Sequence, residues 1–241
     1  MTIVLRARRE AAPVSPGHAC HACVDAVAVS GAGLVLTTDM RTLEPVYTTD
    51  GRAAEVEELQ ATVGQGPAID ALDSGMPIIG DDLASPTSIR RWPTFAPEMT
   101  RIGVRALYSL PLALGAIRVG VLDLYHDTPR ELTHDQLLDA LIYADTALLL
   151  VLDSRSGIAT PMDAGTATTD GPTLWHAEVH QAAGMVSEQL GISVLDALVR
   201  LRAHAYGHGQ QLTAVARSVV ERRLRFHPDD PATGHDRKGY P

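Results

Sequence analysis

The sequence "HQAAGMVSEQLGIS" (residues 180–193) contains the end of one predicted helix and the start of another. Gly191 is typical of the position just after a helix, and Ser193 is a favoured capping residue for the next one. The run from Gln181 to Gly184 is unusual inside a helix, because an interior glycine costs about 0.5–1 kcal/mol relative to alanine. Side chains this small predict that another group comes close to the helix backbone.

A unit of three short helices surrounds this run. Ser193 and Thr213 are expected to cap the second and third helices. Apolar residues recur at helical spacing at Trp175, Val179, Ala182, Val186 and Leu190, and then at Val194, Ala197, Leu198, Leu201 and Ala205. Three short helices bury little surface, so the unit needs close packing or a second copy of itself.

The composition indicates a folded protein with a core of small aliphatic side chains. Of the 241 residues, 45% are hydrophobic, 20% are charged and only 4% are aromatic. No window of about 18 consecutive apolar residues occurs, so no membrane span is predicted. The N-terminus lacks the long apolar segment of a secretory signal, and a cytoplasmic location is therefore expected.

Two segments without a hydrophobic period divide the chain. Residues 154–173 are rich in Gly, Ser, Thr, Pro and Asp and predict a flexible linker, and residues 227–241 predict a disordered tail. The domains are then 15–153 and 174–226. The part up to residue 153 has a net charge of −9, whereas the helical domain has six arginines against four acidic residues, a net of +2. This excess is well below that of a tight nucleic-acid binder.

The first domain alternates helix and strand patterns, which predicts an α+β fold with a largely antiparallel sheet flanked by helices. "GQGP" (64–67) predicts a turn into a helix, and "DDLASPTSIRRWP" (81–93) is loop-like. Gly115-Ala116 predicts a hairpin. Helices are expected at 18–29, 51–63 and 133–153, and Thr133 is expected to cap the last of them. Strands are expected at 33–38, 43–48, 76–80, 103–114 and 117–125. A turn at Asp39 would join the first two strands.

Both domains resemble known families. "QAAGMVSEQLGISVLDALVRLRAHA" and "QQLTAVARSVV", within residues 181–220, resemble the ANTAR family of RNA-binding antiterminator modules. The first domain is similar to the GAF sensor domains of the actinobacterial type that precede ANTAR. The carrying motifs are "GQGPAIDA" (64–71), "DDL" with "RWPTF" (81–95), "GVRALYSLPL" (103–112) and "GVLDLYHDTP" (120–129).

The resemblance implies a regulator rather than an enzyme. ANTAR proteins bind paired small hairpins in nascent RNA and so prevent a terminator from forming, and GAF–ANTAR proteins are generally homodimers. The implied partners are RNA hairpin loops, a second copy of the chain, RNA polymerase and a small-molecule ligand of the GAF domain. No cofactor, metal, catalytic residue or membrane is expected.

The same resemblance assigns RNA-binding residues. Arg202 occupies the basic position of the family on the second helix and is expected to contact phosphate or base. Gln181, Ala182 and Gly184 would let the sugar–phosphate approach the first helix. Thr213 and Arg217 would support them from the third helix. Two departures weaken the match: Ala183 stands where many members have Lys, and "GHGQQ" (207–211) lacks the usual basic residues.

Other functions remain open from the residues alone. "HACHAC" (18–23) holds Cys20 and Cys23, which indicate either two buried core thiols or a redox or metal motif. The chain could therefore be a GAF-type cysteine redox enzyme, or its C-terminal unit a plain DNA- or protein-binding helical module. The loop 81–95 could line a ligand pocket, or Trp92 and Phe95 could fill that space. "GQGP" lacks the Lys-Ser/Thr of a phosphate-binding loop.

Overall fold

A computed structural model describes residues 3–37, 43–115, 117–155 and 173–227 of the chain. The chain divides into two compact units, Met1–Pro172 and Thr173–Pro241. Most of the predicted linker and tail, the turn at Asp39 and Ala116 of the predicted hairpin lie outside the described residues.

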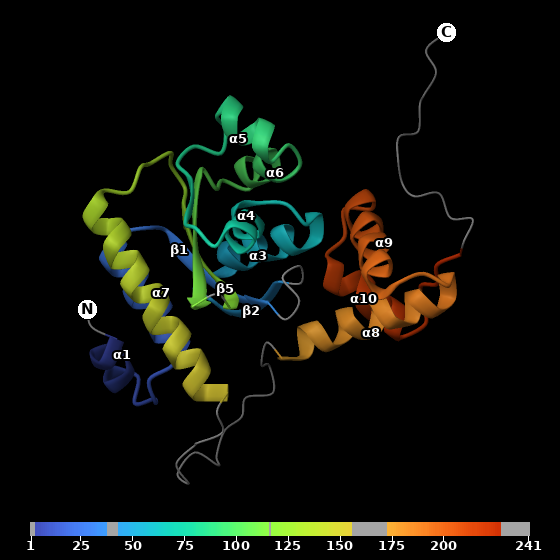
Figure 1. The fold of residues 1–241 in the computed structure, drawn as a ribbon, viewed down its shortest axis with the longest axis horizontal. Coiled ribbons are helices and arrows are strands. Elements are labelled where there is room, and N and C mark those ends of the chain that lie inside the picture. Colours follow the sequence, from blue (N-terminus) through green and yellow to red (C-terminus); the bar gives the residue numbers. More distant parts are fainter. Residues whose placement is uncertain (1–2, 38–42, 116, 156–172, 228–241) are drawn as a thin grey trace. The chain divides into compact units, whose positions relative to one another are not determined.

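The N-terminal unit is built on one five-stranded sheet with strand order β2-β1-β5-β4-β3, in which every neighbouring pair is antiparallel (Figure 1). This confirms the predicted antiparallel sheet. The pairing of β1 with β5 places Leu34 opposite Leu122 and Gly33 opposite Asp123. The strands are β1 (Gly31–Thr37), β2 (Leu43–Thr48), β3 (Ile78–Gly80), β4 (Ala106–Leu114) and β5 (Ile117–His126).

Helices cover both faces of this sheet, and each face has its own core (Figure 1). One face packs against α2 (Pro16–Val27) and α7 (His134–Arg155), with α1 (Ile3–Arg9) against α2. The other face is covered by α3 (Gly51–Val63), α4 (Pro67–Ser74), α5 (Pro86–Arg91) and α6 (Phe95–Arg101). The flanking helices of the prediction are thereby confirmed.

Local capping signals account for several of these boundaries. The Thr133 hydroxyl accepts the backbone N–H of Gln136 at 3.2 Å, as predicted for the start of α7. The prediction of a loop over 81–93 was wrong, because α5 lies within it. Ser85 caps α5 by accepting the Ser88 N–H at 3.2 Å, and Pro86 follows at the first helical position. A serine followed by proline is a helix-start signal.

The C-terminal unit consists of α8 (Thr173–Leu190), α9 (Val194–Gly207) and α10 (Leu212–Val220), packed around one core. Ser193 caps α9 as predicted, since its hydroxyl accepts the Asp196 N–H at 3.1 Å. The prediction that Thr213 caps the third helix was wrong. Gln211 occupies the N-cap position, since α10 begins at the buried Leu212 and Thr213 already lies within its first turn.

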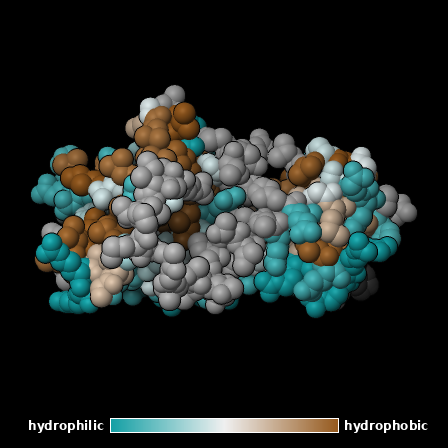
Figure 2. Space-filling view, turned by 90° about the horizontal axis from the view of Figure 1, so that it is seen from below, coloured by the Kyte–Doolittle hydropathy of each residue, from teal (hydrophilic) through white to brown (hydrophobic). Residues whose placement is uncertain are grey.

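The outer surface of α1 and α7 is partly apolar. Leu138, Ile142 and Leu149 of α7 are 47%, 62% and 63% exposed. The side chains of Val4 and Leu5 of α1 are exposed to a similar degree. Figure 2 shows hydrophobic side chains gathered on the N-terminal unit. Within the described part of the chain, no helix is long and apolar enough to cross a membrane.

Gly120 sits where β5 passes closest to β1, and it provides a test of the sheet. A Cβ built there would overlap the carbonyl oxygen of Val35, a backbone atom that cannot rotate away. We expect Gly120→Ala to lower the free energy of unfolding of the N-terminal unit by at least about 2 kcal/mol. Gly51→Ala is the matched control, because nothing lies within 4 Å of its Cβ position. Urea unfolding of both variants checks this, and equal stability would contradict the register.

Candidate functional site

The small residues of α8 have two different roles. Ala182 and Ala183 are 0% and 2% exposed and belong to the core of the C-terminal unit. Gly184 is half-buried, and a Cβ built there would meet no described atom within 4 Å. The alanines therefore allow the three helices to pack closely, whereas the glycine leaves open space on the outside of the helix.

This placement corrects the assignment of Ala182 as an RNA contact. Its side chain is sealed in the core, so it can act only as a packing residue. Gln181 is exposed, and Gly184 and Glu188 follow it at spacings of three and four residues, which puts all three on one outer stripe of α8. Ala183 also faces inward, so its difference from the family's lysine concerns a buried position.

The other three predicted residues lie on α9 and α10. Arg202 is half-buried on α9, and Thr213 is half-buried in the first turn of α10. Arg217 is exposed and lies one helical turn beyond Thr213. Its Nε is 3.3 Å from Glu178 Oε2 on α8, in a pair whose side chains are 55% and 31% exposed. Exposed pairs of this kind contribute at most about 1 kcal/mol, so a phosphate could displace Glu178.

A pair of histidines links the last turn of α9 to the residue that follows the helix. The rings of His204 and His208 stack, with their centroids 4.0 Å apart. The His204 ring also contacts the Phe226 ring edge-on, with 5.3 Å between the two ring centroids. From the sequence, the turn "GHGQQ" is notable only for its lack of Lys and Arg. The stacking was not foreseen, although the spacing of four residues was a signal for it.

A buried polar cluster links α3 to the sheet in the N-terminal unit. Gln60 donates from Nε2 to Asp123 Oδ2 at 2.7 Å and to Glu57 Oε2 at 3.3 Å. The Ser109 hydroxyl donates to the other oxygen of Asp123. The Gln60 side-chain oxygen accepts the N–H of Ala68 at 2.8 Å, which ties the start of α4 to the same cluster. All four side chains, Glu57, Gln60, Ser109 and Asp123, are at most 1% exposed.

The cluster holds two carboxyl groups in a space without water-facing surface. Burial, followed by the neighbouring Asp123 carboxylate, raises the pKa of Glu57 well above its ordinary value. Burial also raises the pKa of Asp123. Glu57 lies directly over Gly33, where any Cβ would collide with its carboxyl group. The folded unit therefore holds a proton on this pair of carboxyl groups more tightly than the unfolded chain does.

This proton gives a pH dependence of stability with a definite sign. Because the folded pKa is raised, the stabilisation is fully present below the ordinary carboxyl pKa and is lost as the pH rises toward the folded pKa. Each pH unit in that window lowers the free energy of unfolding by about 1.4 kcal/mol. Glu57→Gln should remove this slope and be more stable than the wild type at pH 8.

Denaturation at pH 5 to 9, followed by Trp92 fluorescence in a Trp175→Phe background, measures this effect. Glu55→Gln is the matched control, since Glu55 is exposed on the same helix. The control should keep the wild-type slope. A wild-type stability that rises between pH 6 and pH 8 would show that the cluster does not hold a proton.

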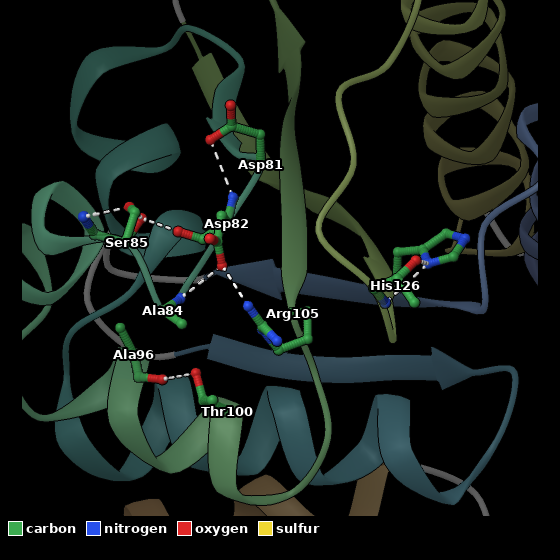
Figure 3. A network of polar contacts seen from close by, with 10 residues as sticks. Asp81, Asp82, Ala84, Ser85, Ala96, Thr100, Arg105 and His126 are labelled. Atoms are coloured by element: carbon green, nitrogen blue, oxygen red, sulfur yellow. Dashed lines mark hydrogen bonds and ion pairs between the residues drawn. The ribbon is translucent and has the colours of Figure 1, made fainter.

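The loop after β3 is fixed by polar contacts rather than left open. Figure 3 shows the Asp82 carboxylate accepting the Ala84 N–H and the Arg105 guanidinium, both at 3.0 Å. The Ser88 hydroxyl donates to the Asp82 carbonyl at 2.7 Å. The loop is thereby joined to the N-terminal side of β4 and to α5.

The space beneath this loop is filled by aromatic side chains. Trp92 and Phe95 are 2% and 0% exposed and belong to the core under α3, α4 and α6. Trp92 also donates from Nε1 to Asp70 at 3.1 Å. Of the two alternatives for this loop, the one in which these aromatics fill the space agrees with the structure.

The two cysteines are core residues in the structure. Cys20 and Cys23 are free thiols, fully buried where α2 packs on the sheet. Burial raises the pKa of Cys20 to about 12 and also raises that of Cys23. Since the thiolate is the reactive form, both thiols are poor nucleophiles. Among the described residues, no group of three or more His, Cys, Asp or Glu side chains could hold a metal ion.

Comparison with known proteins finds solved structures that are similar to part of the chain. No family model matches the chain, and no curated protein matches it. A domain of a two-component sensor histidine kinase protein from Sinorhizobium meliloti is 18% identical, covering 57% of this chain and 88% of that one, with a TM-score of 0.46. Also similar is the GAF domain of a phosphoenolpyruvate-protein phosphotransferase from Coxiella burnetii, which is 13% identical, covers 64% of this chain and 93% of that one, and has a TM-score of 0.48. The GAF-B domain of DevS from Mycobacterium smegmatis is 19% identical, covers 58% of this chain and 92% of that one, and has a TM-score of 0.43.

Proposed function

We propose that this protein is a signal-responsive regulator that binds paired hairpins in nascent RNA and thereby prevents transcription termination. The N-terminal unit would be a GAF-type sensor and the C-terminal unit an ANTAR-type RNA-binding module. The observation that carries the proposal is the open backbone at Gly184 on the outer stripe of α8. The sequence resemblance over residues 181–220 supports it.

The chemistry of the outer stripe suits an RNA loop. Proteins recognise RNA loops by holding the unstacked bases against their backbone and side chains, and by placing cationic groups near the phosphates. At Gly184 a sugar or base can approach the helix without meeting a side chain, and exposed Gln181, one turn earlier, offers both a donor and an acceptor. Arg202 and Arg217 would supply the cationic contacts from α9 and α10.

A second copy of the chain would allow two hairpins to be bound together. Leu138, Ile142 and Leu149 of α7 are exposed at spacings of four and seven residues, a pattern typical of a helix-packing seam. Pairing through α7 would place two C-terminal units on one dimer. A small molecule or protein signal acting on the N-terminal unit would then change the placement of these units by a shift in population.

The test is a gel-shift assay with a two-hairpin RNA, using the wild type and two variants of Gly184. Gly184→Leu adds bulk to a position with no described neighbour, and leucine is the better helix former, so the fold should be kept or stabilised. We expect it to weaken RNA binding at least about 10-fold, a loss of about 1.4 kcal/mol. Gly184→Ala should lose much less.

Two outcomes would contradict the proposal. One is the absence of any shift by the wild-type dimer at low salt. The other is equal affinity of the wild type and Gly184→Leu. Competition with duplex DNA addresses the alternative of a DNA-binding helical module, and Cys20→Ser with Cys23→Ser addresses the redox alternative, because RNA binding should not need either thiol.

A further inference from the structure

The segment that follows α10 forms a short strip of arginines on the C-terminal unit. Exposed and inward-facing residues alternate from Arg223 to His227. Arg223, Arg225 and His227 are exposed, whereas Leu224 is half-buried and Phe226 is 7% exposed. Arg222, just before them, is also exposed. We call Arg222, Arg223 and Arg225 the arginine strip.

The arginine strip carries all of the excess positive charge of the helical domain. Residues 174–226 contain six arginines and four acidic residues. Residues 221–226 contain three of these arginines and only Glu221, a net of +2. The remaining residues, 174–220, are therefore neutral, with three arginines and three acidic residues. The small net charge of the domain conceals a local concentration of cations.

The strip is held in place by its inward-facing residues. The Phe226 ring belongs to the core of the unit and contacts His204 of α9. Its backbone N–H donates to the side-chain oxygen of Gln189 on α8 at 2.9 Å. Leu224 packs against the same core. Leu224 and Phe226 therefore anchor the segment to the core, while Arg223 and Arg225, on either side of Leu224, are exposed.

Arg222 occupies a backbone conformation that favours glycine. Its φ is +60°, and the N–H groups of Arg222 and Arg223 donate to the carbonyls of Val219 and Ser218, both at 2.9 Å or less. These two bonds form a Schellman motif, in which the left-handed residue is usually glycine. Arginine therefore occupies a position where glycine would be less strained.

The charge and spacing of the strip fit a chain of phosphates. Among the described residues, Arg223 pairs with Glu221, and neither Arg222 nor Arg225 has an ion pair. The apolar residues between them face the core, so the strip has no hydrophobic side chain to insert into a lipid surface. Each guanidinium can form paired hydrogen bonds to phosphate oxygens, so three exposed arginines within four residues suit a ligand with several phosphates, such as a nucleic-acid strand.

We propose that the arginine strip is an additional binding site for the sugar–phosphate backbone of RNA, beyond the residues of α8, α9 and α10 named above. This inference rests on the proposed function. Phosphate contacts are independent of sequence, so the strip would add affinity and fix the orientation of the RNA without selecting the loop. It would also supply the cations that the turn 207–211 lacks.

The experiment measures the salt dependence of RNA binding by the full chain. The probe is a fluorescently labelled two-hairpin RNA with randomised loops, because phosphate contacts do not need a defined sequence. Replacing all three strip arginines by glutamine should flatten the plot of log affinity against log salt by about 2 units, at about 0.7 for each contact. The control replaces Arg8, Arg90 and Arg101, three exposed arginines of the N-terminal unit, and should keep the wild-type slope.

Arg222→Gly separates binding from folding. Glycine relieves the left-handed backbone, so the thermal midpoint of the C-terminal unit should stay the same or rise, while RNA affinity falls. Equal slopes for the wild type and the strip variant would overturn this inference and leave the proposed function standing. If the wild type shows no binding at the lowest salt, both fail. A slope that falls equally in the control variant would show a general charge effect and would also overturn the inference.

Discussion

The C-terminal unit depends on the close approach of three short helices through alanine. Its core contains Ala182, Ala183, Ala197, Ala205 and Ala216, and Phe226 is the one aromatic side chain buried in it among the described residues. Small side chains let the helices pack tightly but fill little volume. Phe226 adds the missing bulk from the chain beyond α10. The same packing that completes the core therefore carries the arginines to the surface.

The N-terminal unit is organised by a polar interaction instead. Gln60 joins α3 to β5 through Asp123 and joins α3 to α4 through the N–H of Ala68. The carboxyl groups of Glu57 and Asp123 are kept together by burial and by the close approach that Gly33 permits. A fully satisfied buried network specifies one arrangement of its elements. Among the described residues, Glu57 Oε1 has no hydrogen-bond partner, so this network is not fully satisfied at that atom.

Local signals predicted much of the fold, and distant contacts limited the rest. The caps at Thr133 and Ser193, the strands and the turn at 64–67 follow from neighbouring residues. The pairing of Gln60 with Asp123 could not be predicted, because 63 positions separate them and no local pattern links the two residues. Ala182 was assigned to the RNA surface because the resemblance does not distinguish inward from outward positions. The arginine strip was missed because net charge was averaged over the domain.

The most direct measurement of the central claim is hydrogen–deuterium exchange of the full chain with and without a two-hairpin RNA. If the outer stripe of α8 and the segment after α10 together contact RNA, amides around Gly184 and at 221–227 should exchange more slowly in the complex. Those of β5 should be unchanged. Protection confined to the N-terminal unit, or none in the C-terminal unit under conditions where RNA is bound, would contradict the account.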